Sequence, residues 1–169
     1  MLDEFDRKIL ATLQVDSSLS VQDVADRVGL SSTPCWRRIQ KLESLGYIRG
    51  RVALLNADKL NVGVSVFIAV KTNQHNAEWV DRFRKIVTGF PEVVDFFRLS
   101  GDVDYLIRAV VPDIRAYDEL YQRLIAKIDL YDVSSMFAME QIKSTTELPL
   151  VYASTTSGRG TTRQAIAAH

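Results

Sequence analysis

Two short helical patterns lie almost next to each other near the N-terminus, and their spacing limits how the first fifty residues can fold. Apolar residues at helical intervals follow Ser20, which is a good helix cap, and Gly29 fits the position that ends this helix. Only "GLS" lies before the next helix, which Ser31 can cap and Gly46 ends. Two short helices joined by a tight glycine-containing turn form a helix-turn-helix, and residues 3–15 add a further amphipathic helix.

The second helix of this unit separates apolar from basic side chains. Cys35, Ile39, Leu42 and Leu45 form one apolar stripe, and Pro34 lies in the first turn, where its missing N–H costs little. Within residues 37–51 there are five basic residues and one acid, although the net charge of the whole chain is zero. A local basic patch is typical of a protein that contacts phosphate, and a solvated helix face is the alternative.

The pattern predicts contact with double-stranded DNA. Side chains near the start of the second helix commonly reach base edges in the major groove, so we expect Thr33, Arg37 and Arg38 to read bases. Lys41, Arg49 and Arg51 are expected to hold phosphates. The full predicted DNA-binding set is Ser32, Thr33, Pro34, Trp36, Arg37, Arg38, Lys41, Arg49 and Arg51. A three-helix packing unit that never meets DNA is the competing interpretation.

The rest of the chain carries strand and helix patterns in the order βαββαβ. After "YIRGRVALL", whose alternation suggests a strand or small wing, strands are predicted over residues 64–72, 93–101, 104–112 and 133–144, and helices over 77–90 and 113–128. This order is typical of the ferredoxin-like arrangement, a four-stranded antiparallel sheet with two helices on one face. Because "VSVFIAV" is apolar on both faces, we expect a second copy to cover the other face in a homodimer formed sheet to sheet.

Five segments carry a wider pattern: "LDEFDRKIL", "VADRVGLSSTPCWRRIQKLESLGYIRG", "VALLNADKLNVG", "SGDVDYLIRAVVPDIRAY" and "FAMEQIKSTTELPL". In this order they resemble the Lrp/AsnC family of feast/famine transcription regulators. The resemblance implies an α+β fold, with an N-terminal winged helix-turn-helix and a C-terminal ferredoxin-like βαββαβ ligand-binding domain. It also implies a sequence-specific DNA-binding regulator whose dimers assemble further, often into an octamer, with an amino-acid effector bound between dimers. "TPCW" and "FAMEQIK" look most similar to a branch that responds to cysteine, so we expect cysteine or another small or apolar amino acid.

The expected domain organisation combines the patterns with the resemblance. Residues 1–51 form the DNA-binding domain, residues 52–63 a hinge, and residues 64–152 the βαββαβ effector-binding and oligomerisation domain. Residues 153–169 are rich in Gly, Ser and Thr and are predicted to be a disordered tail.

The turn "GDVD" is the predicted effector site. Gly101 permits a turn whose N–H groups point outward, which suits a carboxylate, and the resemblance implies that Asp104 holds an α-ammonium group. An acidic hairpin turn without a ligand is the alternative. The full predicted set is Arg98, Leu99, Ser100, Gly101, Asp102, Val103, Asp104, Tyr105, Ser134, Ser135 and Met136. The last three lie on the strand that resembles the other pocket wall, and core packing is an equal alternative for Met136.

Two other functions compete with regulation by an effector. Sirohaem decarboxylases resemble the family in fold, but neither His75 nor His169 lies in a predicted pocket, and we find no catalytic set, metal-ligand cluster or cofactor motif. A thiol switch at Cys35 is the other alternative, since a thiol at a helix N-terminus can have a lowered pKa. Its place on the apolar stripe favours inert packing.

The location of the protein follows from what the sequence lacks. No apolar run approaches the roughly 18 residues that span a bilayer, and the acidic start "MLDEFDRK" has no apolar signal core. The single cysteine cannot form an internal disulfide. We therefore expect a cytoplasmic protein that is not an enzyme and has no membrane partner.

Overall fold

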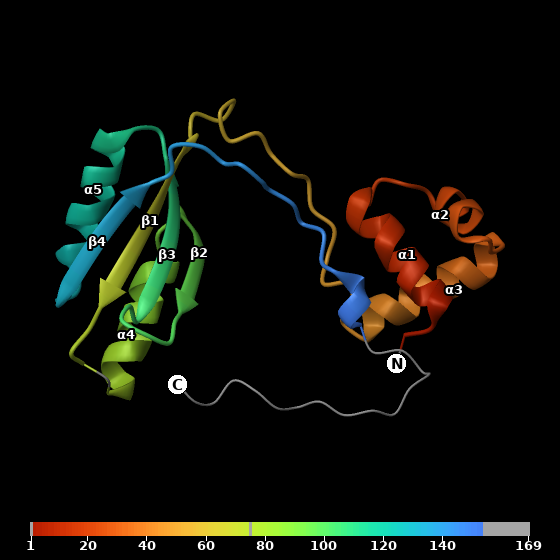
Figure 1. Ribbon diagram of the computed structural model, residues 1–169, viewed down its shortest axis with the longest axis horizontal. Helices are drawn as coiled ribbons and strands as arrows, with labels where there is room; N and C mark the ends of the chain where they lie inside the picture. Colours follow the sequence, from red (N-terminus) through yellow and green to blue (C-terminus); the bar gives the residue numbers. More distant parts are fainter. Residues whose placement is uncertain (1, 75, 154–169) are drawn as a thin grey trace. The chain divides into compact units, whose positions relative to one another are not determined.

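The computed structural model describes residues 2–74 and 76–153, which fall into two compact units. Within these residues, one unit consists of residues 2–53 and 143–153, and the other of residues 54–142 (Figure 1). His75, His169 and the predicted tail beyond Ala153 lie outside the described residues. None of the helices in the described part has the length and hydrophobicity that crossing a lipid bilayer requires.

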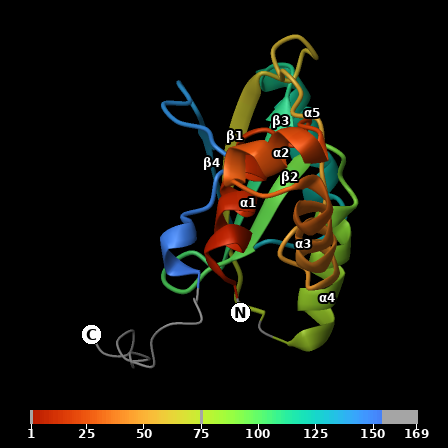
Figure 2. The same cartoon turned by 90° about the vertical axis from the view of Figure 1, so that its right-hand side faces the viewer.

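The first unit contains three short helices, which Figure 2 shows gathered together: α1 (Glu4–Val15), α2 (Val21–Val28) and α3 (Ser32–Ser44). Side-chain capping explains where α1 and α2 begin, whereas Ser31, the expected cap of α3, makes no side-chain capping bond. Asp3 and Asp6 form a capping box at the start of α1, and Ser20 and Asp23 form another at the start of α2. Gly29 ends α2 in the left-handed conformation, with φ +74°, which glycine adopts without strain. These features confirm the predicted helix-turn-helix.

One apolar core holds the three helices together. Ile9 of α1, Val24 of α2 and Ile39 of α3 are all buried, and so is the remainder of the predicted stripe on α3 except Leu45, which is exposed. Leu45 is the C-cap residue, one position past the last residue of α3. Burying an aliphatic side chain of this size contributes about 1.5–3 kcal/mol to folding, so the stripe is sufficient to fix the face of α3 that points inward.

The predicted strand or wing after Gly46 is not formed. Among residues 2–74 the first strand begins only at Val64, and residues 49–56 have no regular structure. A strand needs a neighbouring strand for its N–H and C=O groups, and no other strand belongs to this unit within the described residues.

The second unit confirms the predicted βαββαβ order. Its elements are β1 (Val64–Lys71), α4 (Ala77–Thr88), β2 (Val93–Arg98), β3 (Tyr105–Val111), α5 (Ile114–Ile125) and β4 (Asp132–Phe137). The strands form one antiparallel sheet in the order β2-β3-β1-β4. Both helices cover one face of it (Figure 1).

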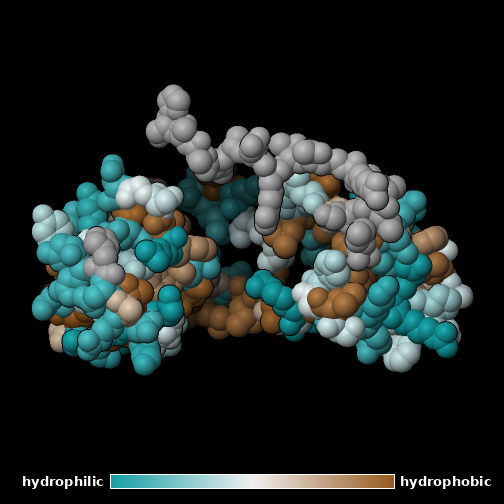
Figure 3. All heavy atoms as spheres, turned by 90° about the horizontal axis from the view of Figure 1, so that it is seen from below, coloured by the Kyte–Doolittle hydropathy of each residue, from teal (hydrophilic) through white to brown (hydrophobic). Residues whose placement is uncertain are grey.

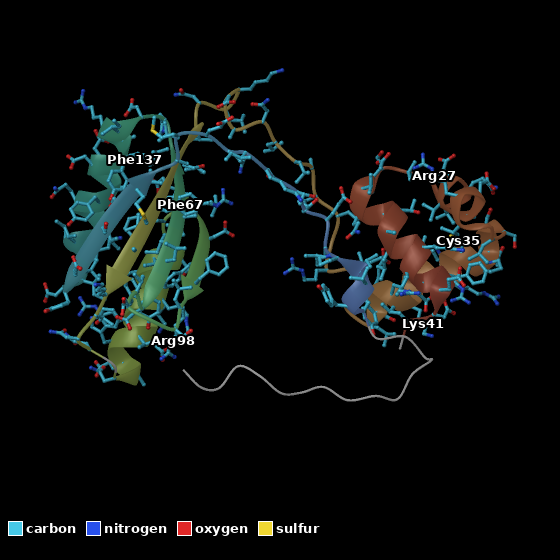
Figure 4. The ribbon with its side chains drawn as sticks, viewed as in Figure 1. Arg27, Cys35, Lys41, Phe67, Arg98 and Phe137 are labelled. Carbon is cyan, nitrogen blue, oxygen red and sulfur yellow. The ribbon has the colours of Figure 1, made fainter. Side chains whose placement is uncertain are left out.

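Alternation along the strands divides the sheet into two faces. Val66, Ile68 and Val70 of β1 are buried against the helices, where they pack with an aromatic group that includes Phe83 and Tyr105, whose ring centroids are 5.0 Å apart. Because side chains alternate along a strand, Phe67 points to the opposite face. Figure 4 labels this residue at the middle of the sheet. The opposite face is called the helix-free face below.

The last strand is shorter than predicted. It was expected over residues 133–144, but β4 ends at Phe137, which is opposite Val66 near the start of β1. One more bond follows, from the Ala138 N–H to the Ser65 carbonyl at 2.9 Å, and only Val64 of β1 lies beyond Ser65.

The chain beyond β4 joins the first unit rather than the sheet. The Leu148 N–H donates to Gln14 Oε1 at 3.0 Å, and Gln14 Nε2 donates back to the Leu148 carbonyl at 3.3 Å. A short 3₁₀ helix, Leu150–Tyr152, follows, and Ala153 packs on the helical core. The ligand-binding domain was expected to extend to residue 152, but residues 143–153 group with the helices instead.

Candidate DNA-binding surface and effector loop

The predicted DNA contacts that are exposed on α3 include a hydroxyl, an indole and two cations. Thr33, Trp36, Arg37 and Lys41 are exposed, and the Trp36 side chain keeps 51% of its surface accessible. Lys41 is labelled in Figure 4 on the same helix as Cys35. Pro34 is exposed in the first turn, as predicted. An indole, a hydroxyl and two cations on one helix face provide the groups that stack on, hydrogen-bond and neutralise nucleic acid.

Ser32 and Arg51 of the predicted set are also bonded within the unit. The Ser32 hydroxyl donates to Gln22 Oε1 and so ties the start of α3 to α2. Arg51 Nη2 lies 3.1 Å from Glu43 Oε1, with both side chains substantially exposed. An exposed ion pair of this kind is worth at most about 1 kcal/mol, so Arg51 can exchange Glu43 for a phosphate at small cost. Arg49 is exposed.

Arg38 has a different environment from its neighbours. Its Nη1 atom lies 2.6 Å from Asp3 Oδ2 and 2.7 Å from Asp6 Oδ1, and its guanidinium carbon lies 5.5 Å from the centre of the Phe5 ring. The Asp6 side chain is only 4% exposed. We expected Arg38 to read bases, but its guanidinium is directed at α1 and its charge is balanced there. The prediction that Arg38 reads bases is therefore wrong for this structure.

Gln40 belongs to the exposed face of α3 and was not predicted. It lies one turn beyond Arg37 and Trp36, it is exposed, and its Nε2 donates to Glu43 Oε2 at 3.0 Å. A glutamine amide can bind adenine through two hydrogen bonds. Helical spacing from Arg37 is the sequence signal that identifies Gln40, which the predicted set lacked.

Cys35 is a buried packing residue. None of its surface is accessible, and it belongs to the apolar core with Ile39 and Leu42. Burial raises the pKa of the Cys35 thiol, and the nearby Arg38 charge offsets this only in part. A reactive cysteine needs access and a lowered pKa, so the position favours packing over a thiol switch.

The predicted effector loop joins β2 to β3 at one end of the sheet. The Leu99 N–H donates to the Asp104 carbonyl at 2.8 Å, and the Asp104 N–H donates to the Val70 carbonyl at 3.1 Å. The Asp104 carboxylate accepts the Thr72 N–H at 2.8 Å through Oδ2. Asp104 therefore lies half-buried between β3 and the end of β1. Its Oδ2 atom is bonded to Thr72, and Oδ1 takes no part in that bond.

The tip of the loop is open to solvent. Ser100, Gly101 and Asp102 are exposed, Val103 is half-buried, and Leu99 is 41% exposed. Gly101 has φ +123°, a conformation that residues with a side chain rarely adopt. The glycine is therefore required by the turn, as expected.

Three of the predicted effector residues point away from this loop. Tyr105 is 5% exposed and packs in the aromatic core, and Arg98, which is paired with it across β2 and β3, lines a cavity of about 160 Å³ on the helix side. The Ser135 hydroxyl is bonded to the hydroxyl of Tyr117 on α5. These three residues therefore lie on the helix side of the sheet.

The two predicted walls of the effector site lie apart within one chain. Ser134 and Met136 are exposed on the helix-free face, where they pair with Ala69 and Phe67 of β1. In the strand order, β3 and β1 separate β2 from β4, so the loop that joins β2 to β3 does not meet β4 directly. Within residues 2–74 and 76–153, no group of His, Cys, Asp and Glu side chains is arranged to hold a metal ion.

Comparisons with known proteins agree with both units. A family model described as a winged helix-turn-helix DNA-binding unit matches residues 2–49, and one described as the Lrp/AsnC ligand binding domain matches residues 65–148. The DNA-binding transcriptional activator DecR of Escherichia coli K12 is 50% identical over 151 residues, which are 89% of this chain and 99% of DecR. The chain belongs to the Lrp/AsnC family. It is a DNA-binding transcriptional regulator with a ligand-binding domain, and not an enzyme.

Solved structures of this family share the fold. An AsnC family transcriptional regulator from Agrobacterium tumefaciens is 62% identical, with a TM-score of 0.88 over 90% of this chain and 99% of the other. A transcriptional regulator from Neisseria meningitidis, solved as a complex with L-Met, is 36% identical, with a TM-score of 0.85 over 89% of this chain and 97% of the other. The α+β architecture predicted for the Lrp/AsnC family is thereby confirmed.

Proposed function

We propose that this regulator binds sequence-specific sites on double-stranded DNA through the exposed face of α3. Thr33, Arg37 and Gln40 lie on that face and reach bases in the proposed complex. Lys41, Arg49 and Arg51 hold phosphates on either side. What supports this assignment is the separation on α3 between a buried apolar face and an exposed face that carries hydroxyl, amide and cationic groups.

The effector in this proposal is a small or apolar amino acid, with cysteine as the first candidate. It binds at the loop of residues 99–104, where Asp104 holds its ammonium group and the N–H groups around Gly101 hold its carboxylate. The single observation that carries this part is the position of Asp104, whose carboxylate is fixed by the Thr72 N–H at 2.8 Å beside an exposed glycine turn. The Neisseria meningitidis relative, which is solved with L-Met, supports an amino-acid ligand in this fold.

The protein forms a homodimer in this proposal, through the helix-free face of the sheet. Phe97 of β2 and Met136 of β4 keep 51% and 50% of their surface accessible, and Phe67 lies between them in the strand order. On the same face Arg108 and Asp95 form a hydrogen-bonded ion pair at 2.6 Å. Brown, hydrophobic residues reach the surface of the sheet unit among teal, hydrophilic ones in Figure 3. An apolar patch of this kind favours association with a second copy.

Further assembly would complete the effector site. Because β3 and β1 separate the effector loop from β4 within one chain, a second chain that brings its own surface to the loop supplies the missing wall. Dimers therefore assemble further, with an octamer as the expected product. An effector can shift that assembly only if its affinity differs between the assembled and unassembled states.

Thermal-shift screening with the twenty amino acids tests the effector assignment. We expect cysteine or another small or apolar amino acid to raise the unfolding temperature, since a ligand that binds only the folded state stabilises it. Light-scattering mass measurements with and without that amino acid then show whether assembly changes. If no amino acid stabilises the protein, the effector proposal is refuted, while selective binding to a duplex would still support the DNA-binding part.

A further inference from the structure

The N-terminus of α1 is bonded to α3, the helix proposed to contact bases, through Arg38. Arg38 Nη1 contacts Asp3 at 2.6 Å and Asp6 at 2.7 Å, and the guanidinium lies over the Phe5 ring at 5.5 Å. The two acids are also fixed to each other, because the Asp6 N–H donates to Asp3 Oδ1 at 2.8 Å and the Asp3 N–H donates to Asp6 Oδ2 at 3.2 Å. Asp3 and Asp6, which hold Arg38, are therefore fixed in place by the capping box of α1.

The charge balance of this cluster is unsuited to holding phosphate. Two carboxylates surround one guanidinium, so the cluster carries a net negative charge. Asp6 is only 4% exposed, and a phosphate could replace it only by leaving a buried carboxylate without its partner. Separating this partly buried pair is unfavourable, because the Asp6 carboxylate would stay out of water without its cation. We therefore expect Arg38 to stay on α1 when DNA binds.

The same contact fixes a helix start that is otherwise weakly anchored. Ser31 occupies the cap position of α3 but makes no side-chain capping bond, unlike Asp3 and Ser20 on the other two helices. Besides the apolar stripe, the first turns of α3 are held by the Ser32–Gln22 bond and by Arg38. Arg37 follows the same backbone and lies beside Arg38 in sequence, so its direction depends on how α3 is rotated.

We propose that Arg38 is a positioning residue for DNA recognition. Held by Asp3 and Asp6, it fixes the rotation of α3 on α1 and thereby aims the exposed face of α3, without touching DNA itself. This inference rests on the proposed contact of that face with bases. It assigns to Asp3 and Asp6, two acids in a unit that binds a polyanion, a role that supports binding.

Salt dependence separates positioning from contact. The probes are a duplex selected by the wild-type protein from a random-sequence pool and a scrambled duplex of the same composition. Arg38→Gln should weaken binding to the selected duplex by about tenfold or more, comparable to the loss of one base contact, with little change for the scrambled duplex. The slope of log affinity against log salt should stay at the wild-type value. The control Arg37→Gln should reduce that slope by about one if Arg37 meets a phosphate, or weaken selected-duplex binding alone if it meets a base.

Neutralising Asp3 or Asp6 gives a second test, in which electrostatics and positioning predict opposite changes in affinity. Asp3→Asn and Asp6→Asn each delete a negative charge, so pure electrostatics predicts tighter binding to every duplex. Positioning predicts weaker binding to the selected duplex. Asn is as good a helix cap as Asp, so Asp3→Asn keeps α1 intact. Asp23→Asn is the matched control, because Asp23 is the equivalent capping-box acid of α2 and its bonds are to Ser20 instead.

The outcomes distinguish the two proposals. The positioning role is overturned if Arg38→Gln lowers the salt slope by about one, or if Asp3→Asn and Asp6→Asn tighten selected binding as Asp23→Asn does. If Arg37→Gln keeps the wild-type affinity for the selected duplex and the wild-type salt slope, the exposed face of α3 is not the DNA-binding face. The positioning role of Arg38 then fails as well. Should Arg38→Gln fail to fold by circular dichroism, Asp3→Asn decides alone, because Asp3 is 44% exposed and its loss is mild.

Discussion

Replacing Asp104 with asparagine separates the two roles that the structure gives this carboxylate. Its Oδ2 atom accepts the Thr72 N–H at 2.8 Å, and an asparagine oxygen can accept the same bond. Only the negative charge is lost. A hydrogen bond between charged groups contributes about 1.5–3 kcal/mol. If Asp104 holds the effector's ammonium group, Asp104→Asn should weaken effector binding by about tenfold to a hundredfold.

Asp104→Ala removes the acceptor as well as the charge. The Thr72 N–H then loses its partner, and Thr72 is only 9% exposed, so water cannot easily replace it. An unsatisfied buried N–H costs about 1–3 kcal/mol. We therefore expect the alanine variant to lose stability and effector binding together, whereas the asparagine variant loses effector binding alone.

Calorimetric titration of the amino acid found by thermal shift measures the affinity, and urea unfolding measures the stability. Asp102→Asn is the control, since Asp102 is an exposed acid two residues away in the same loop. It should change the affinity much less than Asp104→Asn. DNA binding by each variant without effector should match the wild type. The ammonium role of Asp104 is refuted if Asp104→Asn binds the effector as tightly as wild type while Asp104→Ala is merely destabilised.

Three further predictions concern packing, assembly and pH. Cys35→Ser places a hydroxyl in an apolar site with no accessible surface, so the free energy of unfolding should fall by about 1–3 kcal/mol, while peroxide should leave DNA binding by the wild type unchanged. If the proposed sheet-to-sheet dimer forms, Phe67→Glu should prevent it and lower the mass measured by light scattering, whereas Ile114→Glu, at an exposed position on α5, should leave that mass unchanged. The pKa of Asp3 is lowered in the folded state, because desolvation, which raises it, is outweighed by bonds from the Asp6 N–H and Arg38. Its contribution to stability is therefore present above the ordinary value of 3.8 and is lost as pH falls through the lower folded pKa, so Asp3→Asn should flatten this loss in urea unfolding.

The sequence predicted most elements because their causes are local. Helical spacing, caps and the Gly29 turn depend on neighbouring residues, and the first three helices were placed to within a few residues. The end of β4 depends on register instead. Phe137 pairs with Val66, near the first residue of β1, so the strand stops there although strand-like residues continue. The local sequence of β4 does not show where its partner strand begins.

The effector residues were predicted as a group, and the structure divides them by face. Tyr105 directly follows the loop, and Ser135 lies on the strand that resembles the other pocket wall. Period-two alternation from the buried Ile107 places Tyr105 on the helix side, so this error was avoidable from the sequence. The face of the sheet on which Ser135 lies was harder to predict from the sequence. It depends on the pairing of β4 with β1, and its partner Tyr117 lies 18 residues earlier in the chain.

The cations of α3 show how position on a helix decides function. Arg37 and Arg38 are adjacent and chemically identical, yet one turns to solvent and the other is held by acids 35 and 32 residues earlier. Arg38 lies one turn from both Cys35 and Leu42, so it borders the buried stripe, and a charge there must find a partner within the fold. The acids in "LDEFDRKIL" supply that partner. In a helix-turn-helix, a basic residue that borders the apolar stripe should therefore be compared with the acids of the preceding helices before it is assigned to DNA.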